Sequence, residues 1–273
     1  MDVIVKDILE ECTFAYVFWG VVVFWLGCCF ASFLNVCIWR MPLGESVVNV
    51  PSHCPKCNHK IRWYENIPLF SFLALRGKCS GCKQPISWRY FIVELSGGLL
   101  TLATYLKMTF SDEYFYMIIP YTIIIMISIA SAFIDFEHRI IPNQLTYFGI
   151  LSGIIFYTAL TFLLKWGWKF LLFYFVQILV VAGFLFLFHL LGKKLFKQDA
   201  FGMGDVKFIT AIVALSNIFI GVYALFIASI AGLTAGIIIA KSQKKSIKGM
   251  TIPFGPFLAA ASIIAILLFK VMQ

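Results

Sequence analysis

The feature that most constrains this fold is a series of long apolar runs. The first extends roughly from Phe14 to Trp39, and others follow through most of the 273 residues. Each run is close to the roughly 20 residues that cross a bilayer as a helix. Hydrophobic residues make up 61 % of the chain and charged residues only 13 %. Because helices satisfy their own backbone hydrogen bonds in lipid, the sequence predicts an all-α, polytopic membrane protein.

The amino-terminal segment does not have the pattern of a signal peptide. Such peptides begin with basic residues, whereas this segment carries Asp2, Asp7, Glu10 and Glu11 against a single lysine, Lys6. We therefore expect the first apolar run to be retained as a membrane span.

About eight spans are predicted, with a long polar stretch between the first and the second. The run 206–240 is 35 residues long, which allows one tilted helix or two helices with a turn near Ser216-Asn217. Basic residues flank both of its ends, which favours both ends on the cytosolic side and therefore two crossings. The alternative is a single long helix, which would give seven spans in all. Before the fourth span, Asn143 is expected to cap the helix after Pro142. The predicted spans are 14–39, 90–106, 116–134, 143–164, 168–190, two within 206–240, and 253–268.

The lysine and arginine residues set the predicted orientation. Of 22 such residues, 17 lie in the segments that this topology places in the cytosol and 5 in the outer segments. This bias follows the positive-inside rule and places both termini outside. The formal charge of +9 therefore reports topology and not nucleic-acid binding. The basic cluster at 241–248 is expected to lie near anionic lipid headgroups.

Three domains follow from this arrangement. Residues 1–39 form the first membrane helix with a short outer amino terminus, and residues 40–89 form a cytosolic loop. Residues 90–273 form a core of seven membrane helices. The oligomeric state is not encoded in any pattern that we recognise.

Four cysteines in the cytosolic loop form two Cys-x-x-Cys pairs, Cys54 with Cys57 and Cys79 with Cys82. Two such knuckles can complete a tetrahedral thiolate site for zinc. Disulfides are disfavoured in the cytosol, and two redox dithiols or four unrelated cysteines are the alternatives. With every position filled by cysteine, the Zn²⁺ would be structural. His53 and His59 are expected to lie beside the site without binding the metal.

Two carboxylates stand at predicted membrane edges, Asp135 at the end of the third span and Asp205 after Gly202-Met203-Gly204. Acids in such places are costly and are functional candidates. The predicted topology puts both at the cytosolic surface, where a pair sharing one proton could hydrolyse a peptide bond. Alternatively, Asp135 pairs with His138 or Arg139, and Asp205 is favoured by the dipole of its helix.

The sequence resembles the type IV prepilin peptidases of bacteria along nearly its whole length. The resemblance rests on Ser32-Phe33-Leu34-Asn35-Val36, Arg40-Met41-Pro42, the two cysteine pairs, Trp63-Tyr64-Glu65-Asn66-Ile67-Pro68, Leu75-Arg76-Gly77, Ile86-Ser87 with Tyr90 and Glu94, Asp135 with Ile140-Ile141-Pro142-Asn143, Gly202-Met203-Gly204-Asp205-Val206-Lys207, and Pro253-Phe254-Gly255-Pro256.

This resemblance implies an aspartic endopeptidase of the bacterial cytoplasmic membrane with Asp135 and Asp205 as its catalytic pair. Such enzymes cut the basic leader of prepilins and pseudopilins after a glycine, on the cytosolic side. Relatives with the cysteine loop also methylate the new amino terminus with S-adenosylmethionine. Its binding residues are not visible as a motif. Glu65 and Glu94 are weak candidates for that site, and pairing with Arg62, Arg76 or Arg89 is their alternative role.

Three other interpretations stay open at this stage. The chain could be a peptidase without methyltransferase activity, or an intramembrane protease of the presenilin type, which shares Gly-x-Gly-Asp. Against the latter, Ile134 precedes the first aspartate where a tyrosine is expected, and the cysteine loop has no counterpart there. A transporter or scaffold whose acids relay protons is the non-enzymatic alternative.

Overall fold

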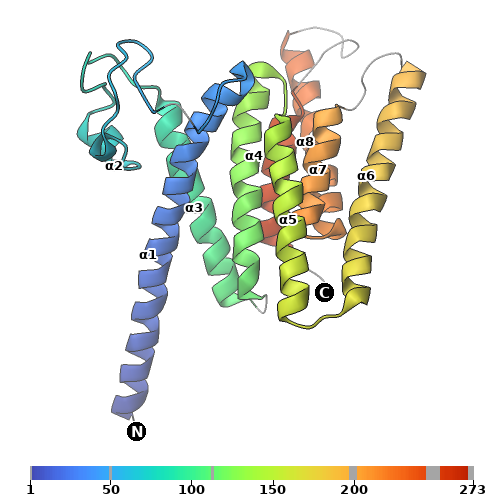
Figure 1. Ribbon diagram of the computed structural model, residues 1–273, viewed down its shortest axis with the longest axis horizontal. Coiled ribbons are helices and arrows are strands. Elements are labelled where there is room, and N and C mark those ends of the chain that lie inside the picture. The colour runs from blue at the N-terminus through green and yellow to red at the C-terminus, as the bar shows by residue number, and fades with distance from the viewer. Residues whose placement is uncertain (1, 49–50, 112–113, 197–201, 244–252, 270–273) are drawn as a thin grey trace. The chain divides into compact units, whose positions relative to one another are not determined.

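The computed structural model describes residues 2–48, 51–111, 114–196, 202–243 and 253–269 (Figure 1). Within these ranges the regular structure is helical, and pairing between extended segments is limited to two isolated bridges in the cysteine loop. The predicted all-α class is therefore confirmed. The chain divides into two compact units, residues 1–118 and 119–273, which we describe separately.

The first unit is built on two long helices, α1 (Asp2–Arg40) and α3 (Trp88–Phe110). They pack closely, since a Cβ atom added at Gly97 would lie 2.4 Å from the Cβ of Ala31. Small residues of this kind let membrane helices approach one another. The loop between the helices contains three short elements, η1 (Met41–Leu43), η2 (Trp63–Glu65) and α2 (Phe70–Ala74), and η3 (Phe115–Met117) follows α3.

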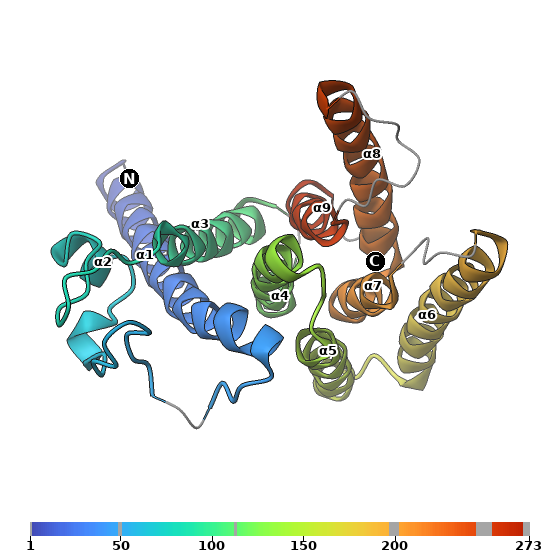
Figure 2. The same cartoon turned by 90° about the horizontal axis from the view of Figure 1, so that it is seen from above.

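The second unit is a bundle of six helices in the residues that the structure describes. They are α4 (Ile118–His138), α5 (Asn143–Leu163), α6 (Trp168–Phe196), α7 (Met203–Leu215), α8 (Ile218–Gln243) and α9 (Gly255–Leu268). Helix α7 packs against α5, α6 and α8, as the view from above shows (Figure 2). Its residues Phe208, Ile212 and Leu215 are at most 1 % exposed, so α7 forms the centre of the bundle.

Among the described residues, six helices are long and apolar enough to cross a membrane, fewer than the eight predicted spans. The other two predicted spans correspond to α7, with 13 residues, and α9, with 14, which are shorter than a full crossing requires. The predicted division of 206–240 is confirmed, because α7 ends at Leu215 and α8 begins at Ile218. The protein is thus a multi-pass membrane protein with six long candidate spans in the described residues. These are Phe14–Leu43, Trp88–Phe110, Phe115–His138, Asn143–Leu163, Trp168–Lys194 and Ile218–Gln243.

The turn between α7 and α8 explains why α7 can be so short. Backbone groups at this turn form hydrogen bonds with side chains from α5 and α6. The Tyr157 hydroxyl donates to the Ser216 carbonyl (3.2 Å), the Tyr174 hydroxyl donates to the Ala214 carbonyl (2.8 Å), and Gln177 accepts from the Ile218 N–H (3.0 Å). A chain reversal inside the bundle therefore leaves none of these three groups unpaired.

The predicted cap at Asn143 is wrong. Asn143 does not cap α5, because Pro142 takes the capping position and the Asn143 side chain instead accepts a hydrogen bond from Lys207 (2.8 Å). Of the basic cluster at 241–248, Lys241 lies in the last turn of α8, whereas Lys244, Lys245 and Lys248 lie outside the described residues.

Candidate active site and metal centre

Asp135 and Asp205 lie at the same end of the second unit. The last turn of α4 and the first turns of α7 and α9 meet there (Figure 1). Asp135 is 7 % exposed and Asp205 is half-buried. The start of α7 packs against the segment after α4, and the Asp135 carboxylate is close enough for its charge to act on Asp205, so the fold brings together two acids that are 70 positions apart in the chain.

The Asp135 carboxylate is held by the beginning of α9. The backbone N–H of Gly255 donates to Oδ2 of Asp135 at 2.9 Å. A Cβ atom at position 255 would lie 2.6 Å from that oxygen and 2.8 Å from Asp135 Cγ, so no larger residue fits without displacing the carboxylate. The positive end of the α9 dipole also faces this negative charge. Sequence reasoning missed this contact, although the Gly-Pro step at the start of an apolar run was its visible signal.

The two glycines before Asp205 allow neighbouring atoms to pack closely against the backbone. They are not required by an unusual backbone conformation. Gly202 caps α7 with an ordinary φ of −68°. A Cβ at Gly204 would lie 3.2 Å from Ile141 Cβ, and one at Gly202 would lie 2.9 Å from Asp205 Oδ2. The start of α7 therefore packs tightly against the segment that follows α4, and Lys207 extends this junction through its bond to Asn143.

The four predicted cysteines form a separate cluster in the first unit. The Sγ atoms of Cys54, Cys57, Cys79 and Cys82 all lie within 4.8 Å of one another. Two of the Sγ–Sγ distances, Cys54 to Cys82 and Cys57 to Cys79, are 3.9 Å. Tetrahedral zinc with Zn–S bonds of about 2.3 Å requires sulfur atoms about 3.8 Å apart. The cluster could therefore hold a metal ion of this kind.

The two knuckles share one backbone conformation. In the first, the Cys54 N–H donates to the His59 carbonyl and the Asn58 N–H to the Cys54 carbonyl, both at 2.9 Å. In the second, the Cys79 N–H donates to Gln84 at 2.9 Å and the Lys83 N–H to Cys79 at 3.0 Å. Both Asn58 and Lys83 have positive φ, 57° and 59°. Each knuckle forms the same turn, and the two turns together bring the four sulfur atoms into one cluster.

Glu65 and His59 join the two knuckles. Oε2 of Glu65 lies 3.2 Å from Nε2 of His59, which in turn lies 3.0 Å from the Ser80 hydroxyl in the second knuckle. The backbone N–H of Arg62 donates to Glu65 (2.9 Å) and, together with Ser80 and His59, lowers the pKa of Glu65 to about 2. The Glu65 carboxylate therefore accepts its hydrogen bond from the backbone of Arg62, within the same loop. His53 Nδ1 lies 3.1 Å from the Pro51 carbonyl.

Glu94 ties the loop to the two long helices of the first unit. It is 8 % exposed, and its Oε2 accepts the N–H of Leu69 at 2.8 Å. The Ser32 hydroxyl of α1 also hydrogen-bonds with the Glu94 carboxylate. Leu69 has a φ of 61°, an unusual value for a residue with a side chain. Glu94 therefore anchors a strained point of the loop to α3 and α1.

A helical membrane bundle that brings two carboxylates together, in a chain that also carries a four-cysteine loop, is the architecture of a polytopic membrane peptidase. The chain belongs to the type IV leader peptidase family. Residues 122–237 match that family, and residues 25–108 match the bacterial peptidase A24 N-terminal domain.

Curated relatives support the same assignment. A protein of Stutzerimonas stutzeri named prepilin leader peptidase/N-methyltransferase is 31 % identical over 89 % of this chain and 88 % of its own. One of Vibrio cholerae with that name is 34 % identical over 73 % of this chain and 78 % of its own. One of Myxococcus xanthus is 41 % identical over 70 % of this chain, but only 54 % of its own length is covered. No solved structure matches the chain.

Proposed function

We propose that this enzyme removes the basic leader of prepilins and pseudopilins as an aspartic endopeptidase and then methylates the new amino terminus. The observation that carries the proposal is the juxtaposition of Asp135 and Asp205 where α4 ends and α7 begins. The names of the relatives supply the substrate class, and the intact cysteine loop matches the part of the family linked to methyl transfer.

In the proposed hydrolysis one carboxyl group is ionised and the other keeps its proton, because two close carboxylates do not both ionise readily. The ionised group takes a proton from water, whose oxygen bonds to the scissile carbonyl carbon, and the protonated group donates to the carbonyl oxygen. The C–N bond then breaks, its electron pair stays on nitrogen, and the new amine takes the proton that the base accepted from water, while the other carboxyl group recovers its proton from a hydroxyl of the collapsing diol. We assign the role of base to Asp135. The Gly255 N–H donates a hydrogen bond to its Oδ2, and such a bond favours the ionised form of a carboxyl group.

The charge distribution supports cleavage on the cytosolic side of the bacterial inner membrane. In the described part of the second unit, Arg139, Lys193, Lys194, Lys207 and Lys241 lie at the end that carries the acids, and only Lys165 and Lys169 lie at the other end. Positive residues favour the cytosolic side. The same residues would meet the anionic headgroups of the surrounding lipid.

In the proposed methylation S-adenosylmethionine, when bound, would supply a methyl group to the lone pair of the new amine, with the thioether as leaving group and the amine proton passing to water. We propose that Zn²⁺ bound by Cys54, Cys57, Cys79 and Cys82 holds the loop for this step without taking part in it. Glu65 and Glu94 would then act by fixing the loop, since both bind loop backbone N–H groups.

Removal of the metal is expected to separate the two activities. In Cys57→Ser enzyme the four-thiolate site is incomplete, so zinc content falls and methylation of a cleaved pilin is lost. Leader cleavage stays near the wild-type rate, because both acids belong to the other compact unit. Metal analysis and mass spectrometry of the pilin measure both effects. Cys37→Ser, the same change at a buried position of α1 outside the cluster, is the matched control. Full methylation by a zinc-free Cys57→Ser enzyme would contradict the proposal.

A further inference from the structure

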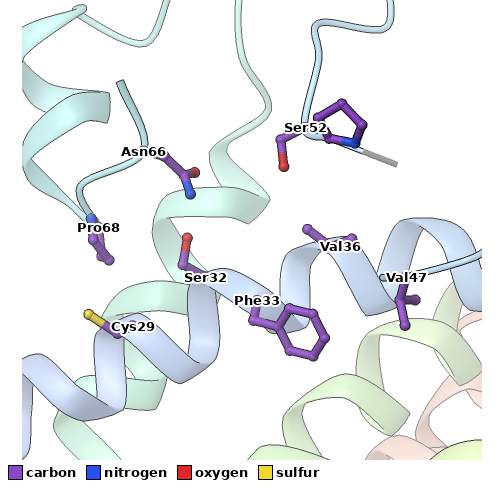
Figure 3. A pocket seen from close by; sticks show the side chains of 9 residues that line it. Cys29, Ser32, Phe33, Val36, Val47, Ser52, Asn66 and Pro68 are labelled. Atoms are coloured by element: carbon purple, nitrogen blue, oxygen red, sulfur yellow. The ribbon is translucent and has the colours of Figure 1, made fainter. Parts of the chain in front are cut away.

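A pocket of about 390 Å³ lies between α1 and the loop that follows it (Figure 3). This volume is in the range of small-molecule sites. One wall is a single face of α1, since its residues recur every three or four positions. The lining residues are Cys29, Ser32, Phe33 and Val36 of α1 and Val47, Pro51, Ser52, Asn66 and Pro68 of the loop.

The pocket combines an apolar wall with a few neutral polar groups. Phe33, Val36 and Val47 supply the apolar side. The Asn66 amide and the Ser32 hydroxyl point toward each other from the loop and from α1, and the Ser52 hydroxyl enters the same space (Figure 3). Such convergence of polar side chains on an apolar cavity is the usual composition of a site for a small organic ligand.

Two charged groups of opposite sign adjoin the pocket. The buried Glu94 carboxylate hydrogen-bonds with Ser32, which lines the pocket, and accepts the N–H of Leu69, which follows Pro68. The buried Arg40 guanidinium donates to the carbonyl of Pro51, another lining residue, at 3.4 Å. Buried charges are weakly screened, so their fields reach into the cavity. A ligand carrying both a positive and a negative group matches this surrounding.

We propose that this pocket binds S-adenosylmethionine. The inference rests on the proposed methyl transfer and names the residues that would hold the donor. The apolar wall suits its adenine ring, the neutral polar groups suit its ribose hydroxyls, and its sulfonium and carboxylate match the two adjoining charges. Glu94 is a positioning residue, because it fixes Ser32 and the Pro68-Leu69 segment on two sides of the cavity.

The test is donor affinity, measured by isothermal titration calorimetry with S-adenosylmethionine on the full-length, zinc-loaded enzyme in detergent. Val36→Trp fills the apolar side of the pocket and is expected to weaken binding at least about tenfold. Asn66→Ala removes one polar group from an exposed loop position and is expected to weaken it by a smaller factor. Val21→Trp, the same change at an exposed position of α1, is the matched control and should bind as wild type does.

Leader cleavage reports folding in each variant and should be unchanged. Wild-type affinity in both Val36→Trp and Asn66→Ala enzymes overturns the pocket while leaving the methyltransferase proposal intact. Failure of the wild-type enzyme to bind the donor and to methylate a cleaved pilin overturns the methyltransferase proposal, and the pocket with it. Weakened binding in the pocket variants alone supports the assignment.

Discussion

Asp135→Asn and Asp205→Asn are each expected to lower the rate of leader cleavage about a thousandfold, the middle of the range that a positioned acid or base contributes. An amide can neither take the proton of the attacking water nor donate one as a carboxyl group does. Both substitutions keep the size of the side chain, and the amide oxygen introduced at position 135 can still accept the Gly255 N–H. The assay is conversion of a synthetic prepilin by purified enzyme, followed by mass spectrometry.

Controls separate lost chemistry from lost folding. Glu137→Gln changes an acid two positions beyond Asp135 on the same helix, whose side chain is 43 % exposed, and it should cleave near the wild-type rate. Both Asn variants should retain zinc and should methylate a pilin supplied already cleaved, since the cysteine loop belongs to the other unit. Normal cleavage by either Asn variant would rule out the acid pair.

Gly255→Ala is expected to slow cleavage by about a hundredfold, the cost of misplacing a reacting group by roughly 1 Å. The added methyl group would stand 2.6 Å from Asp135 Oδ2, so the carboxylate or the start of α9 must move. The hydrogen bond from the residue 255 N–H would lengthen as a result. The measurement is kcat and KM for the synthetic prepilin, and the loss should fall mainly on kcat.

Gly183→Ala provides the comparison, because a Cβ at that position of α6 meets no atom within 4 Å. It should leave both kinetic constants close to those of the wild type. A Gly255→Ala enzyme with wild-type kcat would show that the contact with Asp135 does not position the carboxylate for catalysis.

The local patterns of the sequence predicted much of this architecture. Apolar runs indicated the helical membrane class, and the turn at Ser216-Asn217 followed from charge at both ends of a run that was too long for one span. The spacing of Cys54, Cys57, Cys79 and Cys82 predicted a cluster that the fold assembles. These features depend on residues near one another in the chain, where periodicity and spacing carry information.

Contacts between distant segments were beyond such patterns. The Gly255 N–H reaches Asp135 across 120 positions, and no local signal specifies which backbone group a buried acid will meet. The bond between Glu94 and Leu69, which shapes one wall of the pocket, depends on a loop backbone with positive φ. The hydropathy pattern also predicted full membrane spans where the structure has the shorter helices α7 and α9. A run of apolar residues does not reveal where side chains such as Tyr157 and Gln177 will support a turn.

The most direct test of the account is the intact mass of a synthetic prepilin after incubation with wild-type enzyme and S-adenosylmethionine. We expect two fragments whose masses sum to the precursor plus one water, with the leader ending in glycine. The mature fragment should be heavier by one methylene group only when the donor is present. A precursor that keeps its mass in the presence of folded, zinc-loaded enzyme would contradict the proposed function.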